Sequence, residues 1–131
     1  MKQQFNGPEK RRFKRAVFSI EDGIIGVFSS DDFTNDSMAA SIMILSAGGL
    51  QFILPRDTSP EIGAGDRLIL REIKGTTGLR FVSNLELEVK WVMDLQIFEH
   101  IGIGCEFLNA SDAIMDQIDR FVDSEILYTA S

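Results

Sequence analysis

The chain has 131 residues, of which 44% are hydrophobic and 25% are charged. This length suits one domain with a core of its own, and no apolar run reaches the ~18 residues that a membrane-spanning helix needs. A net charge of −7 disfavours general attraction to nucleic acid or to an anionic membrane. We therefore expect no nucleic-acid partner and no membrane insertion.

Positive charge is concentrated near the N-terminus. Five of the thirteen basic residues fall within residues 10–15, namely Lys10, Arg11, Arg12, Lys14 and Arg15. In an acidic protein, such a local cluster favours a small anionic ligand over a long polyanion. A solubilising tail is the alternative interpretation. We expect residues 1–15 to form a flexible basic arm.

The first half of the chain after the arm predicts short strands. Residues 16–28 place apolar side chains on both sides of Glu21-Asp22-Gly23, which predicts either one bulged strand or two short ones. A polar loop over 29–36 precedes an apolar run over 37–45. The turn Ser46-Ala47-Gly48-Gly49 then leads into a second apolar run, over 50–54. Two apolar runs joined by a Gly-Gly turn predict a hairpin.

The second half continues with strands. Residues 63–66 predict a loop before a short strand around 68–70. The clearest strand is 85–93, where Leu85, Leu87, Val89, Trp91 and Met93 alternate with Glu86, Glu88 and Lys90. This period of two predicts a half-buried strand, and residues 101–107 repeat it.

The chain ends in a different pattern. After Asn109 the apolar residues follow helical spacing (Ile114, Ile118, Phe121, Val122 and Ile126), and either Ser111 or Asn109 is available as the N-cap. About six strands and one helix, without βαβ alternation, predict an all-β domain over 16–131. We expect a small antiparallel six-stranded β-barrel followed by a C-terminal α-helix. The apolar stripe of this helix would cover one open end of the barrel or face a partner.

Residues suited to catalysis or metal binding are scarce. His100 is the only histidine and is interpreted as a surface or barrel-rim residue. Cys105, the only cysteine, is in phase with Ile103 and Phe107, which predicts a buried, inert thiol. One histidine and one cysteine are too few for a soft-ligand zinc site, and the acidic loop 31–36 lacks calcium-loop spacing. We interpret the chain as a non-enzymatic protein without a metal site.

Cellular location is predicted from the same features. A single cysteine excludes an intramolecular disulfide and is typical of a reducing compartment. The polar, then basic N-terminus does not have the pattern of a secretion signal. We expect a cytoplasmic protein.

Three segments resemble the PilZ domain family, a bacterial family that binds cyclic di-GMP. They are an R-x-x-x-R pair at Arg11 and Arg15, an S-x-x-G turn at Ser46 and Gly49, and the glycine-containing segment 101–107 that ends in phenylalanine. The resemblance covers nearly the whole chain, and the order and spacing of the segments are more specific than any one of them. It implies a cyclic di-GMP receptor or adaptor that changes its surface for an unidentified protein partner.

The resemblance also implies which residues bind the ligand: Arg11, Arg15, Ser46 and Gly49, with Arg12 as a further phosphate contact. Arginine suits this role because its planar cation meets phosphate in a bidentate way and can pair with guanine or stack on it. Glycine at position 49 would allow the backbone to approach the ligand or to adopt a positive φ. Without the arginines, Ser46 and Gly49 would be interpreted as a plain hairpin turn.

One position departs from the family pattern. The second motif has Asp or Asn two residues before the serine, where this chain has Ile44. Isoleucine accepts no hydrogen bond from a guanine edge, and the lost contact is worth about ten- to a hundredfold in affinity. The alternative hypothesis is therefore a degenerate PilZ domain that binds no cyclic di-GMP and acts as a protein–protein interaction module.

Overall fold

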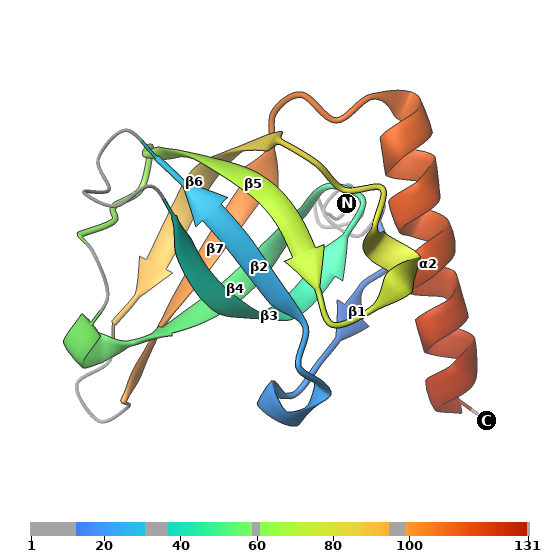
Figure 1. Cartoon of the computed structure of the whole chain (residues 1–131), viewed down its shortest axis with the longest axis horizontal. Coiled ribbons are helices and arrows are strands. Elements are labelled where there is room, and N and C mark those ends of the chain that lie inside the picture. The colour runs from blue at the N-terminus through green and yellow to red at the C-terminus, as the bar shows by residue number, and fades with distance from the viewer. Residues whose placement is uncertain (1–12, 31–36, 59–60, 95–98, 131) are drawn as a thin grey trace, which may run out of the picture.

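Seven antiparallel strands and a C-terminal helix build the fold (Figure 1). The computed structural model describes residues 13–30, 37–58, 61–94 and 99–130. Six strands close a barrel in the order β3-β2-β5-β6-β7-β4, with β4 returning to pair with β3, and β1 adds a seventh strand at the β3 edge. The predicted six-stranded barrel is confirmed.

The elements follow the predicted order. Their bounds are β1 Ala16–Val17, a 3-10 turn η1 Ile20–Asp22, β2 Ile25–Ser29, β3 Met38–Ser46, β4 Gly49–Pro55, η2 Arg56–Thr58, β5 Arg67–Lys74, η3 Thr77–Leu79, β6 Leu85–Met93, β7 His100–Phe107 and helix α2 Asp112–Ala130. Of the two alternatives for residues 16–28, the two short strands are correct, because η1 and Gly23, whose φ is 69°, separate them. Both strands run antiparallel to β3.

Three β-bulges interrupt the alternation of inward and outward side chains. One bulge lies in β3 between Ile42 and Ile44, and another lies in β6 between Val89 and Trp91. The third lies in β5, opposite Val27 and Phe28 of β2. Each bulge places two successive residues outside the core before the next inward residue. The strand expected around 68–70 therefore continues to Lys74, since Ile73 is buried again beyond the bulge.

The core fills the barrel interior. Phe28 and Phe52 are fully buried and their ring centroids lie 4.4 Å apart, and buried aliphatic side chains of β3, β4, β5, β6 and β7 complete the core. Such tight packing of branched and aromatic side chains supplies most of the driving force for folding.

Helix α2 covers one end of the barrel (Figure 1). Its inward side chains Ile118 and Val122 are fully buried, and the ring of Phe121 lies 6.5 Å from that of Phe18. The N-cap is Ser111, whose Oγ accepts a hydrogen bond from the Ile114 amide at 3.2 Å, while Asn109 accepts one from the Glu86 amide of β6 at 2.8 Å. The apolar stripe thus packs on its own barrel. No helix in the described residues is long and apolar enough to cross a bilayer.

Candidate functional site

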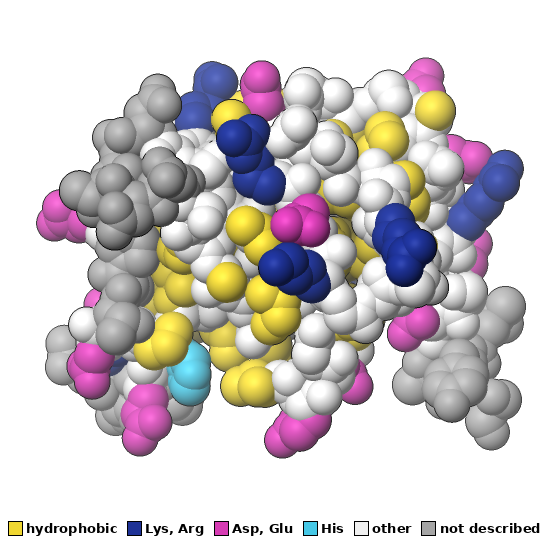
Figure 2. All heavy atoms as spheres, in the orientation of Figure 1, with side chains coloured by type: hydrophobic (Ala, Val, Ile, Leu, Met, Phe, Trp, Pro, Cys, Tyr) yellow, Lys and Arg dark blue, Asp and Glu magenta, His cyan; other side chains and the backbone are white. Residues whose placement is uncertain are grey.

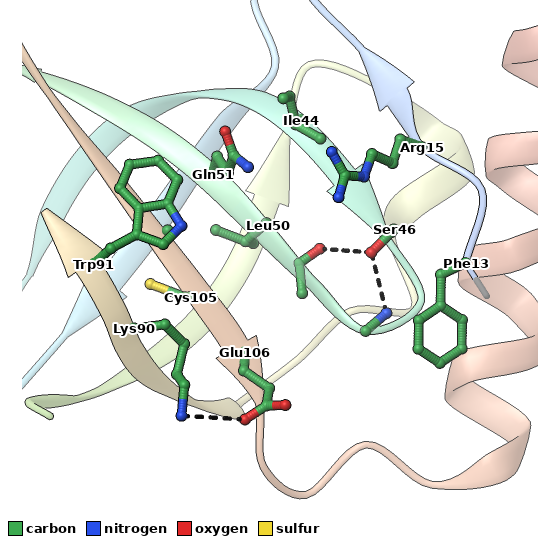
Figure 3. A pocket seen from close by; sticks show the side chains of 13 residues that line it. Phe13, Arg15, Ile44, Ser46, Leu50, Gln51, Lys90, Trp91, Cys105 and Glu106 are labelled. Carbon is green, nitrogen blue, oxygen red and sulfur yellow. Dashed lines mark hydrogen bonds and ion pairs between the residues drawn. The ribbon is translucent and has the colours of Figure 1, made fainter. Parts of the chain in front are cut away.

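Residues 13–15 are the described end of the basic arm, and their three side chains lie in three different places. The ring of Phe13 packs on Gly48, where an added Cβ would lie 2.8 Å from the ring. Lys14 Nζ lies 2.7 Å from Asp123 Oδ1 of helix α2, and this hydrogen bond and charge raise the pKa of Lys14. Arg15 is exposed and lines a pocket on the outer barrel face (Figure 3). The arm therefore connects this pocket with the C-terminal helix.

The turn between β3 and β4 is held by its own serine. Gly48 N–H donates to Ser46 Oγ at 3.2 Å, and the Ser46 hydroxyl donates to the Gly49 carbonyl at 3.4 Å. The Gly48 carbonyl in turn accepts a hydrogen bond from the Phe107 amide at 3.0 Å. Ser46 thus has a structural role in the turn, whatever else it binds.

Gly49 differs from one of the expectations for it. Its φ is not positive. Among the described residues, a positive φ occurs at Gly23, Gly65, Gly75 and Asn84. A Cβ at this position would collide with the carbonyl oxygen of Cys105 on β7. The glycine is needed here because the β4 and β7 backbones approach closely at the start of β4.

One row of outward positions crosses four strands. In the strand register, Ile44 of β3 is opposite Gln51 of β4, Gln51 is opposite Gly104 of β7, and Gly104 is opposite Trp91 of β6. All four residues line the pocket. Ile44 and Trp91 reach the outer face only because each follows a bulge, so they share a surface that simple alternation would not have given them.

Trp91 is the main site residue that the sequence analysis missed. It was grouped with the inward residues of 85–93, but the bulge at Lys90 reverses the pattern, and 38% of Trp91 is exposed, as is 54% of Met93. The indole lies over Gly104, whose missing side chain makes room for it. A tryptophan opposite a glycine was the available signal, but only the strand register reveals that pairing.

The pocket has a volume of about 420 Å³. Within the part of the chain that the structure describes, its charged side chains are Arg15, Lys90 and Glu106, and Lys90 Nζ lies 3.8 Å from a carboxylate oxygen of Glu106. Among the described residues, the lining consists of Phe13, Arg15, Ile44, Ser46, Gly48, Gly49, Leu50, Gln51, Lys90, Trp91, Gly104, Cys105 and Glu106. This volume is in the range of small-molecule sites.

Three of the five predicted site residues meet here. Arg15, Ser46 and Gly49 line the same pocket, and Ile44, the departure from the motif, lines it as well. Arg11 and Arg12 lie outside the described residues.

Cys105 is the buried cysteine of the pocket lining. It is 8% exposed, and burial raises the pKa of its thiol to about 12. The low exposure confirms the prediction of a buried thiol, and the raised pKa keeps that thiol neutral at physiological pH.

A second pocket, of about 250 Å³, is lined by none of the three predicted site residues that the structure describes. It is lined by Ile20, Ile25, Ala39, Ala40, Ser41, Ile53, Pro55 and His100. Figure 2 views the molecule from the side that β2 and β5 cross, and the Lys and Arg side chains visible there are scattered among apolar and acidic ones. The first pocket, with Arg15 and Lys90, is the better candidate for an anionic ligand.

Solved structures share this fold. The PilZ domain of YcgR from Escherichia coli, determined with c-di-GMP, is 17% identical, with a TM-score of 0.70 over 92% of this chain and 94% of that one. The c-di-GMP complex of MrkH from K. pneumonia is 16% identical, with a TM-score of 0.69 over 92% of this chain and 54% of that one. MotI/DgrA of Bacillus subtilis, an inhibitor of motility, is 16% identical, with a TM-score of 0.63 over 92% and 53% of the two chains.

These likenesses establish the fold, and the chain spans about half the length of MrkH and MotI/DgrA. No curated protein matches. The family model of the PilZ domain matches residues 9–124, and the chain therefore belongs to the PilZ domain family.

Proposed function

We propose that this protein is a cyclic di-GMP receptor that uses the pocket between its basic arm and the outer barrel face. The observation that supports this most is the convergence of Arg15, the Ser46–Gly49 turn and Trp91 on one pocket of about 420 Å³. PilZ domains of similar fold have been determined with c-di-GMP, including those of YcgR and MrkH.

The chemistry of the pocket suits a ligand with two phosphates and two guanines. Arg15 makes no hydrogen bond or ion pair through its side chain within the described residues, so its guanidinium is available for a phosphate or a guanine edge. Trp91 offers an exposed aromatic surface at the other end of the row, and stacking a base on such a surface is worth about 1–3 kcal/mol. Arg11 and Arg12 would add phosphate contacts from the arm.

Ligand binding would also change what the domain presents to a partner. Phe13 and Lys14 connect the arm to the turn and to helix α2, through Gly48 and Asp123 respectively. A ligand held by Arg15 would favour the arm position that makes these contacts and so bias a two-state arm. The receptor would then act as a non-enzymatic adaptor for a protein partner in the cytoplasm, where the neutral thiol of Cys105 would remain reduced.

The test is a calorimetric titration of cyclic di-GMP into the wild type, Arg15→Ala and Arg67→Ala. Arg67 is exposed on β5 and does not line the pocket, so its variant carries the same charge change. We expect saturable binding by the wild type, a loss of about ten- to a hundredfold for Arg15→Ala, and little change for Arg67→Ala. Absence of binding at high micromolar ligand would contradict the proposal.

A second candidate function rests on Ile44. Its side chain lines the pocket where the family motif has an acid or amide, which favours a domain that has lost the ligand and binds only a protein partner. That function predicts that the calorimetric titration detects no cyclic di-GMP binding by the wild type or by Arg15→Ala. It also predicts that substitutions on the exposed side of α2, such as Arg120→Ala, abolish partner binding while Arg15→Ala does not.

A further inference from the structure

The strand register places an amide side chain directly beside the position that the motif has lost. Ile44 and Gln51 are opposite each other in the antiparallel pair β3–β4, and both side chains line the pocket (Figure 3). Directly opposite residues on one face of such a pair have Cβ atoms about 4.5–5.5 Å apart. A hydrogen-bonding group on Gln51 can therefore reach nearly the same volume as one at position 44.

The side chain of Gln51 is available for a ligand. It is half-buried, and its carboxamide makes no hydrogen bond within the part of the chain that the structure describes. A half-buried amide without an internal partner keeps one acceptor and two donor hydrogens for other molecules.

Gln51 also stands next to the proposed stacking surface. It is opposite Gly104, over which the indole of Trp91 lies, so one strand position separates the amide from the ring. A base stacked on the indole would present its edge along this row. The other acidic or amide side chain of the lining, Glu106, lies in the neighbouring row beside Gly49, with Lys90 3.8 Å from its carboxylate.

We propose that Gln51 forms the hydrogen bonds to the ligand's base edge that Ile44 cannot form. This inference rests on the proposed function and names the residue that sets base specificity in the same site. The Watson–Crick edge of guanine presents an acceptor, O6, beside the donor N1–H. A carboxamide matches this pair with its donor and acceptor side by side.

The carboxamide of Gln51 and a carboxylate in its place differ in their selectivity between guanine and adenine. A carboxylate only accepts hydrogen bonds, so it suits the N1–H and N2–H donors of guanine and opposes the N1 acceptor of adenine. A carboxamide can turn over and match either base. Gln51 therefore gives this pocket a weaker preference for guanine than an acid in its place would give.

The experiment measures dissociation constants of cyclic di-GMP and cyclic di-AMP for the wild type, Gln51→Leu, Gln51→Glu and Gln117→Leu. Both ligands have two phosphates, so the ratio of the two constants cancels the effect of added charge. Gln117 is exposed on α2 and is the matched control, with thermal unfolding as the check on folding.

We expect Gln51→Leu to weaken cyclic di-GMP binding about ten- to a hundredfold, and Ile44→Asn in that background to restore it at least partly. Gln51→Glu is expected to shift the ratio toward cyclic di-GMP, and Gln117→Leu to leave both constants unchanged.

Two results overturn the inference, and they differ. If the wild type binds cyclic di-GMP and Gln51→Leu binds it within twofold, only the role of Gln51 is wrong. If the wild type does not bind cyclic di-GMP at all, the proposed function fails and the inference fails with it.

Discussion

The indole of Trp91 lies over Gly104, its register partner on the neighbouring strand, so closely that a Cβ at position 104 would collide with the ring. This contact holds an aromatic side chain on the outer face of a small barrel, where it lines the same pocket as the Ser46–Gly49 turn and Arg15. The bulge at Lys90 and the missing side chain at Gly104 are both needed for it.

Substituting Gly104 tests this contact. We expect Gly104→Ala to push the indole away and to shift the fluorescence emission of the only tryptophan. The affinity for cyclic di-GMP should fall about ten- to a hundredfold because stacking is lost, with little loss of stability. The control is Gly102→Ala on the same strand, whose Cβ would make ordinary contacts of 3.6 Å with Trp91 and 4.0 Å with Met93. Equal affinity in the two variants would show that the indole position does not matter.

A second prediction concerns the close approach of β4 and β7. Gly49→Ala would force β4 away from the Cys105 carbonyl, and we expect it to lower the free energy of unfolding by about 1–3 kcal/mol. Gly63→Ala serves as the control, because nothing lies within 4 Å of its Cβ. Urea denaturation of both variants measures the difference, and an unchanged midpoint for Gly49→Ala would refute the close approach.

A third prediction concerns the arm. Phe13→Ala removes the ring that packs on Gly48, so the arm must be ordered when the ligand binds. We expect an affinity loss of about two- to tenfold for cyclic di-GMP, since ordering a side chain costs about 0.5–1.5 kcal/mol. Val17→Ala, which truncates a residue that is 74% exposed, should bind like the wild type. Wild-type affinity in Phe13→Ala would mean that the packing of the arm does not position Arg15.

A fourth prediction concerns alkaline pH. Burial raises the pKa of Cys105 from its ordinary 9.0 to about 12, so the stability it contributes is fully present below pH 9 and is lost progressively between about pH 9 and 12. Lys14 also has a raised pKa, but its contribution is lost only above its ordinary 10.5. Between pH 9 and 10.5, the wild type should therefore lose stability faster than Cys105→Ala, by up to about 1.4 kcal/mol per pH unit. Parallel curves from chemical denaturation would contradict the burial of the thiol.

Much of the fold could be predicted because local patterns specify it. Alternating side chains predicted the strand 85–93, the Gly-Gly turn predicted the hairpin of β3 and β4, and helical spacing after Asn109 predicted α2. These signals depend on residues close together in the sequence, and the structure agrees with them.

The site was less predictable because it depends on bulges and register. An outward Ile44 and an outward Trp91 each require an extra residue in the strand, which alternation does not reveal. The pairing of Gln51 with Ile44 and Gly104 is likewise a long-range property. Arg15, Ser46 and Gly49 were identified through their family motif, whereas the reason for glycine at position 49 became clear only from the neighbouring strand.

The central claim is that cyclic di-GMP binds between the arm and the row from Ile44 to Trp91. The most direct test is the mapping of chemical-shift changes in the ¹⁵N-labelled protein during titration with cyclic di-GMP. The account predicts saturable shifts at Arg15, Ser46, Gly49 and Gln51 and at the Trp91 indole N–H, with small changes at Ile25, Ala39 and Ile53 of the second pocket. Shifts confined to the second pocket, or no shifts at high micromolar ligand, would contradict it.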